Sequence, residues 1–292
     1  MAGPTIGLAL SSGGARGSAH IGVLRALEEN GIVPDVIAGT SMGAYVGGAY
    51  ACGASLDDLA QEWCSTSFLR TVRTLLPTFP WSGWTSGGEV VRTLRRTFGE
   101  KTFRDLERPF AALATDLESG APYAITDGSL VDAVRASLSV PGLFTPVWLN
   151  DHLLIDGGVS DPLPIDVVRA MGADVVIAVD VLVDPGEVHM SGLPYLGTKD
   201  RRLNIAKTTR PDEASVRKYH PSVFAVLFQM STVFQRRLCD VVLASSPPDV
   251  RLRPDFTPDP PTYSHLGCGI DAGVAAAERA LPAIRRAIAA AS

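Results

Sequence analysis

Long hydrophobic runs, cysteine motifs and an excess of positive charge are all missing from this sequence of 292 residues. No stretch of about 18 apolar residues occurs, so we expect no membrane-spanning helix. The four cysteines form no C-x-x-C pair, and their spacings suit neither a zinc site nor a disulfide framework. We therefore expect free thiols, mostly buried, and no metal. The formal net charge of -5 argues against a general nucleic-acid-binding protein.

A targeting segment and an internal boundary are also missing. Residues 1–4 lead straight into an apolar segment, without a basic region or a secretory hydrophobic segment. We therefore expect a cytoplasmic protein whose contact with a membrane, at the inner face, is only peripheral. Hydrophobic residues make up 46% and charged residues 20%, as in ordinary globular proteins. Because no repeat or low-complexity linker divides the chain, we expect one domain over residues 1–292.

The segment Gly39-Thr40-Ser41-Met42-Gly43 has the G-x-S-x-G pattern of a nucleophile elbow, a sharp turn between a strand and a helix. The sequence predicts the strand over residues 35–38 and the helix from Met42 to Tyr50. Such a turn exposes the serine hydroxyl, and the glycines remove side chains that would clash. The alternative is a glycine-rich packing turn with an inert serine.

A second glycine-rich loop precedes the elbow. Residues 5–10 predict a buried parallel strand, residues 11–17 a loop with three glycines, and the residues up to Asn30 a helix. Three interpretations compete: a phosphate or dinucleotide loop, a plain packing turn, or an oxyanion hole. The G-x-G-x-x-G and G-K-[ST] patterns of the first interpretation are absent. In the third, the amides of Gly13, Gly14 and Arg16 receive the developing negative charge.

The order of these two loops favours the oxyanion hole. Adjacent parallel strands that are joined by one helix present both of their loops at the carboxyl edge of the sheet. The first strand then supplies amides and the second supplies Ser41 beside them.

A serine nucleophile needs a base, and Asp156-Gly157-Gly158 offers one. This turn follows a predicted hairpin of residues 148–149 and 153–155 around Asn150-Asp151. In isolation, a turn-forming aspartate with a side-chain cap is the commoner use of Asp-Gly. Partial burial would raise the pKa of Asp156 and make it a stronger base.

The histidines are weaker candidates for the base. A Ser41-Asp156-His265 order would match an α/β-hydrolase, but that fold places several strands before its elbow, whereas here one strand precedes the serine's own strand. His20 falls on the first predicted helix, where a structural or rim role is more common. We therefore predict a direct Ser41–Asp156 dyad.

Three other segments have open interpretations. The aromatic loop of residues 79–84 lines an apolar acyl-binding cleft or packs onto the domain. Residues 184–220 lack periodicity and are basic in their second half, which suits contact with anionic lipid headgroups or a solvated loop. The apolar helix that begins at Val223 is buried or forms a dimer contact.

The remaining patterns predict helices at 56–63, 68–75, 89–98, 130–138, 165–171 and 270–290, and strands at 110–115, 122–125, 174–180 and 250–252.

With these pieces together the chain resembles the bacterial patatin-like phospholipases. The matching motifs lie at residues 8–24, 39–44, 114–120, 139–144 and 156–158, and the similarity spans approximately residues 5–182. Two positions depart from the family pattern: Ser12 replaces the first glycine of G-G-G-x-[KR]-G, and Pro162 replaces an asparagine four residues after D-G-G. Proline offers neither a side-chain amide nor a backbone N–H.

The resemblance implies a three-layer α/β/α fold with a mostly parallel central sheet and ester hydrolysis through a serine acyl-enzyme, without metal or cofactor. It implies that Ser41 is the nucleophile and Asp156 the base. The implied oxyanion donors are Gly13, Gly14 and Arg16, and the supporting glycines are Gly39, Gly43, Gly157 and Gly158.

We therefore expect a serine acyl hydrolase that acts on phospholipids, lysophospholipids or other acyl esters, either as a monomer or as a homo-oligomer. Two alternatives remain open. One is a hydrolase of acyl thioesters or small esters. The other is a regulatory protein that keeps the fold and is indifferent to the loss of Ser41.

Overall fold

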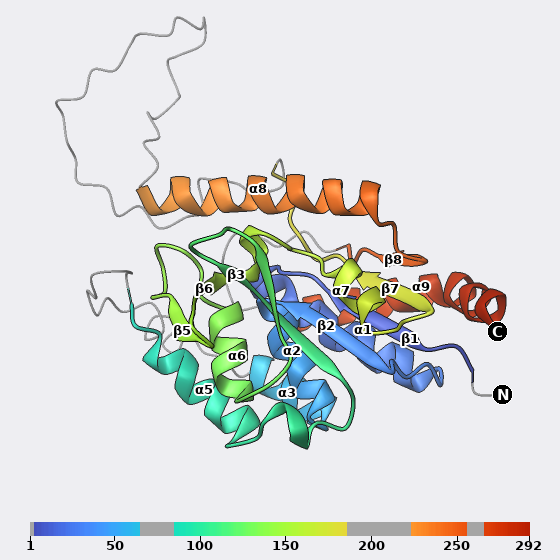
Figure 1. Ribbon diagram of the computed structural model, residues 1–292. Coiled ribbons are helices and arrows are strands. Elements are labelled where there is room, and N and C mark those ends of the chain that lie inside the picture. Colours follow the sequence, from blue (N-terminus) through green and yellow to red (C-terminus); the bar gives the residue numbers. More distant parts are fainter. Residues whose placement is uncertain (1–2, 65–84, 186–222, 256–265) are drawn as a thin grey trace, which may run out of the picture.

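The computed structural model describes residues 3–64, 85–185, 223–255 and 266–292 (Figure 1). The short helix predicted at 68–75, the aromatic loop at 79–84 and nearly all of the segment 184–220 lie outside these residues. The strands are β1 (Ile6–Leu10), β2 (Val36–Thr40), β3 (Phe110–Asp116), β4 (Pro122–Ile125), β5 (Val147–Leu149), β6 (His152–Asp156), β7 (Val175–Val179) and β8 (Val250–Leu252).

The helices agree with the predicted ones to within a few residues at their ends. They are α1 (Ser18–Glu29), α2 (Met42–Ala51), α3 (Leu56–Cys64), α5 (Gly88–Phe98), α6 (Leu130–Ser137), α7 (Ile165–Ala170), α8 (Val223–Ser245) and α9 (Leu266–Ala291). Among the described residues, no helix is both long and apolar enough to cross a membrane. Cys52, Cys64 and Cys239 are free thiols, and the first and last of them are buried as expected.

The eight strands form one mixed sheet in the order β5-β6-β3-β2-β1-β7-β8, with β4 paired to β3. The strands β3, β2, β1, β7 and β8 run parallel. The pairs β3–β4, β3–β6 and β5–β6 are antiparallel. The predicted α/β fold with a mostly parallel sheet is confirmed.

Two strands share one edge of β3. Ala112 and Leu113 pair with both β2 and β4, and Ala114 and Thr115 pair with both β4 and β6. Because a strand has two edges, β2 and β6 lie on the edge opposite β4. Thr40 at the end of β2 lies opposite Leu113, and Asp156 at the end of β6 lies opposite Ala114. The carboxyl ends of β2 and β6 therefore meet head-on.

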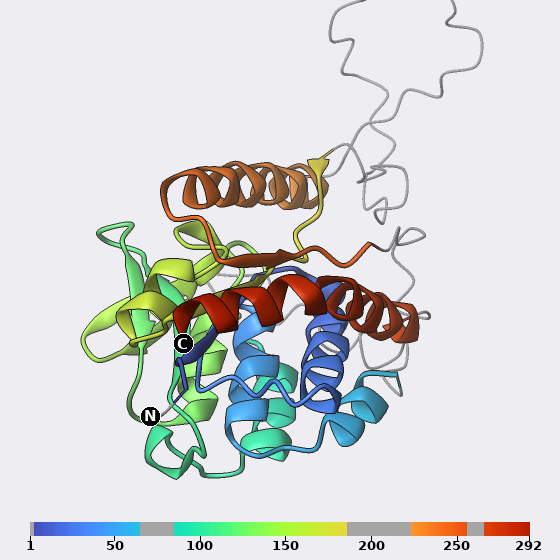
Figure 2. The same cartoon turned by 90° about the vertical axis from the view of Figure 1, so that its right-hand side faces the viewer.

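The sheet is covered on both faces, which gives three layers (Figures 1 and 2). Alternate strand residues point to opposite faces. Leu8, Leu10 and Ile37 face a core made with α1, α2, α5, α6 and α9. On the other face Ala9 and Ala38 belong to a smaller core with α7 and α8. On this face α7 lies against β1, β2 and β7.

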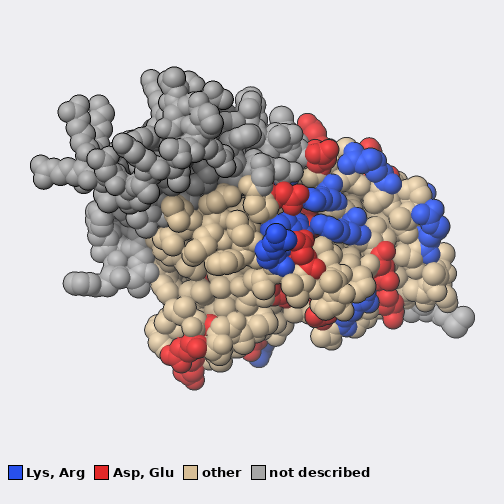
Figure 3. Space-filling view, turned by 90° about the horizontal axis from the view of Figure 1, so that it is seen from above, with Lys and Arg blue, Asp and Glu red and all other residues tan. Residues whose placement is uncertain are grey.

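The outer face of α8 is exposed, so of the two predicted alternatives the buried helix is wrong and the dimer contact stays a prediction. Val226, Leu227, Met230 and Phe234 are exposed, Phe234 to 57%. Figure 3 views the molecule from the α8 side and shows an uncharged area beside a group of charged side chains. The inner face of α8, with Cys239, Val242 and Leu243, packs against the smaller core.

Helices α1 and α9 cross with almost no space between their backbones. A Cβ atom on Gly22 of α1 would lie 1.9 Å from the carbonyl oxygen of Ile270, and one on Gly273 of α9 would lie 2.1 Å from that of Ala19. Neither distance is compatible with a side chain, so the crossing requires glycine at both positions.

Gly22→Ala is expected to lower the free energy of unfolding by about 1–3 kcal/mol, because the new methyl group overpacks this crossing. Urea denaturation measures the loss. Gly88→Ala is the matched control: it adds the same methyl group in open space at the start of α5, where alanine favours the helix. Equal stability of the two variants would show that the crossing tolerates a side chain.

Candidate active site

Ser41 occupies the predicted turn between β2 and α2. Its backbone has φ 54° and ψ -115°, a conformation that costs a non-glycine residue free energy. The residue is 5% exposed. The strained turn lifts Ser41 out of the strand at the carboxyl edge of the sheet and places it at the N-terminus of α2.

The two glycines of the elbow are required by space. A Cβ atom on Gly39 would lie 2.3 Å from the carbonyl oxygen of Gly43. One on Gly43 would lie 2.3 Å from the carbonyl oxygen of Leu10, where the glycine loop begins. The elbow therefore packs backbone to backbone, both within itself and against the glycine loop.

The hydroxyl of Ser41 donates a hydrogen bond to Asp156 Oδ2 at 2.7 Å. The other carboxylate oxygen, Oδ1, accepts from the amide of Gly158 at 2.7 Å. A Cβ atom on Gly157 would lie 2.2 Å from the carbonyl oxygen of Leu113, so glycine is needed where the turn leaves β6. The predicted pair Ser41 and Asp156 is thus brought into direct contact by the head-on ends of β2 and β6.

Burial decides the protonation of Asp156, which is 2% exposed. It raises the pKa of this carboxyl from 3.8 to about 6, and the hydrogen bonds from Ser41 and Gly158 oppose only part of that rise. Among the described residues, no charged group contributes to the shift. A carboxylate with this pKa is ionised at neutral pH and is a stronger base than an exposed aspartate.

Ser137, at the end of α6, holds the backbone of the elbow. The amide of Ser41 donates to Ser137 Oγ at 2.8 Å, and this hydroxyl donates to the carbonyl oxygen of Leu113 at 2.5 Å. Ser137 therefore bridges β2 and β3 at the point where the chain turns away. This role of Ser137 was not predicted from the sequence. A buried serine in line with Leu130 and Val134 on an otherwise apolar helix face was the available signal.

The glycine loop lies beside the elbow, and its tip is open. Gly14 and Ala15 are exposed, and a Cβ atom on Gly14 would meet no atom within 4 Å. Within the described residues, the amides of Gly13 and Gly14 donate to no acceptor. The amide of Arg16 was predicted to be a third oxyanion donor. In the structure it already donates to the carbonyl oxygen of Gly13 at 3.1 Å, in a short helical turn over Gly14–Gly17.

The base of the glycine loop is fixed from several sides. The amide of Ser11 donates to the carbonyl of Val179, and that of Ser12 donates to the carbonyl of Pro162 at 2.9 Å. The two departures from the family pattern, Ser12 and Pro162, are therefore bonded to each other. His20 Nε2 donates to the carbonyl of Ser11 at 2.9 Å.

His20 acts as a structural residue in this arrangement. It is fully buried, and burial lowers its pKa to about 4, so the ring is neutral at pH 7. His152 pairs with Asp116 instead of with the dyad. His265 lies outside the described residues.

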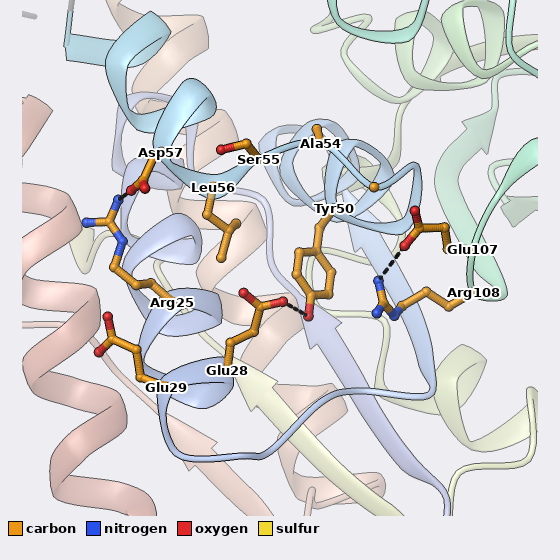
Figure 4. Close-up of a pocket in the computed structure, with 11 residues that line it drawn as sticks. Arg25, Glu28, Glu29, Tyr50, Ala54, Ser55, Leu56, Asp57, Glu107 and Arg108 are labelled. Carbon is orange, nitrogen blue, oxygen red and sulfur yellow. Dashed lines mark hydrogen bonds and ion pairs between the residues drawn. The ribbon is translucent and has the colours of Figure 1, made fainter.

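The pocket in Figure 4 lies away from this site, at the other end of α2. Its volume is about 470 Å³, and most of its charged groups are already paired: Arg25 with Asp57, Arg108 with Glu107, and Glu28 with the hydroxyl of Tyr50. Throughout the described ranges, no group of three or more His, Cys, Asp or Glu side chains could hold a metal ion.

Comparison with known proteins gives a consistent family match. Residues 8–169 match the family model of the patatin-like phospholipases. The chain is 41% identical over 188 residues to patatin-like phospholipase domain-containing protein 6 of Mus musculus, which covers 62% of this chain and 14% of that protein. It is 41% identical over 179 residues to an uncharacterized NTE family protein of Mycobacterium tuberculosis, which covers 61% of this chain and 49% of that one. The chain thus matches half or less of the length of these relatives.

A solved structure supports the fold. The crystal structure of VipD from Legionella pneumophila superimposes with a TM-score of 0.50 at 12% identity, over 97% of this chain and 67% of that one. At this identity the likeness concerns the fold alone.

The raised pKa of Asp156 predicts a stability cost above pH 4. The folded protein binds this proton more tightly than the unfolded chain, so stability is highest below the unfolded pKa of about 3.9 and falls until about pH 6. Asp156→Asn removes this loss. It is expected to raise the free energy of unfolding by about 3 kcal/mol at pH 8 and by about half as much at pH 5.

Urea denaturation at the two pH values measures this difference. Asp271→Asn, on the exposed side of α9, controls for the loss of one negative charge. An Asp156→Asn variant that is destabilised equally at both pH values would contradict the prediction.

Proposed function

Because the chain belongs to the patatin-like phospholipase family, we propose that it hydrolyses acyl esters of lipids through a covalent intermediate on Ser41. In this proposal Asp156 is the base, and the amides of Gly13 and Gly14 stabilise the oxyanion. The two alternatives are a hydrolase of acyl thioesters or small esters and a regulatory protein without catalysis. The kinetic test below distinguishes them from a lipid hydrolase.

One observation carries the proposal: a serine at positive φ donates its hydroxyl hydrogen to a buried, otherwise satisfied carboxylate. A serine in a packing turn needs neither the strained backbone nor the buried acid. Strain and an unneutralised buried carboxyl are both unfavourable for folding, and they are typical of functional sites. The supporting glycines 39, 43 and 157 serve this one contact.

The geometry supports the following reaction. Ser41 Oγ attacks the ester carbonyl carbon, and its proton passes to Asp156 Oδ2 along the existing hydrogen bond. The carbonyl oxygen becomes an oxyanion in the tetrahedral intermediate. Asp156 then gives the proton to the leaving alcohol, which leaves an acyl group on Ser41. A water molecule attacks this ester, returns a proton through Asp156 to Ser41, and releases the fatty acid.

The glycine loop supplies the oxyanion donors in this proposal. The amides of Gly13 and Gly14 are free of acceptors among the described residues, and the loop backs directly on the elbow through Gly43. One such donor is worth about 2.7–4 kcal/mol of transition-state stabilisation. The Arg16 amide would join them only after its bond to the Gly13 carbonyl opens.

The family supports a lipid as the acyl donor, since similar proteins are named phospholipase domain proteins. Transfer of an acyl chain from water to an apolar site yields about 0.8 kcal/mol for each CH₂. We therefore expect kcat/KM for p-nitrophenyl esters to rise with chain length, by up to about fourfold for each CH₂. Lysophospholipid should be cleaved as well.

Ser41→Ala and Asp156→Asn are each expected to lower kcat on the preferred ester by at least about 1,000-fold. Asp161→Asn is the matched control, and it should keep most of the wild-type activity. Asp161 is another aspartate near the site whose pKa burial raises to about 6, but it does not bond to Ser41. Faster cleavage of short esters or of acyl-CoA would contradict the lipid substrate. Full activity of Ser41→Ala would contradict the mechanism.

A further inference from the structure

We propose that Gln235 on α8 is a positioning residue that clasps the glycine loop against the Ser41–Asp156 pair through a hydrogen bond with Ser12. The inference rests on the function proposed above and adds a third element to the site. Ser12 and Gln235 are 223 positions apart in the sequence.

The clasp begins at the loop. Ser12 Oγ donates to Gln235 Oε1 at 2.8 Å, and the Ser12 side chain is buried. Gln235 Nε2 donates in turn to Ser231 Oγ, one turn earlier on α8, at 3.0 Å. Both ends of the carboxamide are therefore occupied, which fixes its orientation. Ser12 immediately precedes Gly13, whose amide is a proposed oxyanion donor.

The same carboxamide touches the turn that carries the base. The position of a Cβ atom on Gly158 lies 3.0 Å from Gln235 Nε2 and 3.0 Å from Asp156 Oδ1. The two polar atoms are therefore no more than about 6 Å apart. Gln235 thus spans from the residue before the oxyanion donors to the residue whose amide binds Asp156.

The neighbouring residue anchors this part of α8. Arg236 Nη1 pairs with buried Asp180, at the end of β7, at 2.9 Å. Arg251 on β8 pairs with the same carboxylate. Burial alone would raise the pKa of Asp180, but these two arginines hold it below its ordinary value. These ion pairs therefore fix the position of α8 next to Gln235.

The clasp also accounts for serine in place of the usual glycine at position 12. Glycine gives a loop more conformational freedom. Here the hydroxyl of Ser12 binds α8 while its amide binds the carbonyl of Pro162. The residue is held on both sides, so the loop needs no glycine there.

The kinetic test compares Gln235→Ala, Ser12→Ala and the double variant. Each single variant should lower kcat on a soluble ester by about 10- to 100-fold with little change in KM, because the oxyanion donors are misplaced. The double variant should be no slower than the slower single variant, since both remove one interaction. Gln229→Ala, a glutamine of the same helix that bonds to Pro185, should stay within twofold of wild type.

Gln235→Glu adds a readout that a purely structural role would not change. Its carboxylate still accepts from Ser12, but it places a negative charge near Asp156. Like charges at this separation raise the pKa of a carboxyl. The acid limb of kcat/KM should therefore move upward from about pH 6, while the activity at pH 9 stays close to that of wild type.

Hydrogen exchange, read by mass spectrometry on the peptide that contains residues 11–17, tests the clasp without activity. Faster exchange in Gln235→Ala and unchanged exchange in Gln229→Ala are expected. An inactive wild type with this exchange pattern would contradict the proposed function but support the contact. An active wild type whose Gln235→Ala and Ser12→Ala variants are folded and within twofold in kcat would overturn the clasp.

Discussion

The hydrogen bond between Ser41 and Asp156 is the contact on which the rest of this structure depends. It forms because β2 and β6 occupy the same edge of β3 from opposite directions. The strand β2 carries the serine out at its carboxyl end, and β6 delivers the aspartate to the same point. No loop closure is needed to bring them together, so the pairing is built into the sheet.

The arrangement that makes this contact possible is unfavourable for folding. Ser41 holds a strained backbone, and Asp156 is a buried carboxyl that has no cationic partner in the described part of the chain. Both persist because the surroundings leave them no other arrangement. Glycines at 39, 43 and 157 admit the close backbone packing, and Ser137 takes up the amide of Ser41. The hydrophobic cores on the two faces of the sheet offset the folding free energy that the strained serine and the buried carboxyl cost.

Much of this was predictable from sequence. Short apolar runs followed by glycine turns give the parallel strands, and parallel strands place their carboxyl ends together. That logic predicted that Gly13 and Ser41 lie at one edge of the sheet. Asp156 was predicted as the base from its Asp-Gly-Gly turn, and its place beside Ser41 depends on the antiparallel pairing of β6 with β3. The hairpin of β5 with β6 followed from its turn residues.

The supporting contacts were not predictable, because each depends on how separate elements pack. Ser137 and Gln235 are single polar residues on helices, and only the packed structure shows which residue each one meets. The occupied amide of Arg16 depends on a local turn that the glycine pattern does not specify. The exposed face of α8 depends on which of its residues pack against the smaller core, and the apolar pattern of the helix does not specify them.

The most direct test is covalent labelling with a fluorophosphonate probe at pH 8, read by intact mass and peptide mapping. The account predicts one adduct per wild-type chain, located on Ser41, with none on Ser41→Ala and much slower labelling of Asp156→Asn. An adduct that survives Ser41→Ala, or a folded wild type that takes no label, would contradict an activated serine at this position.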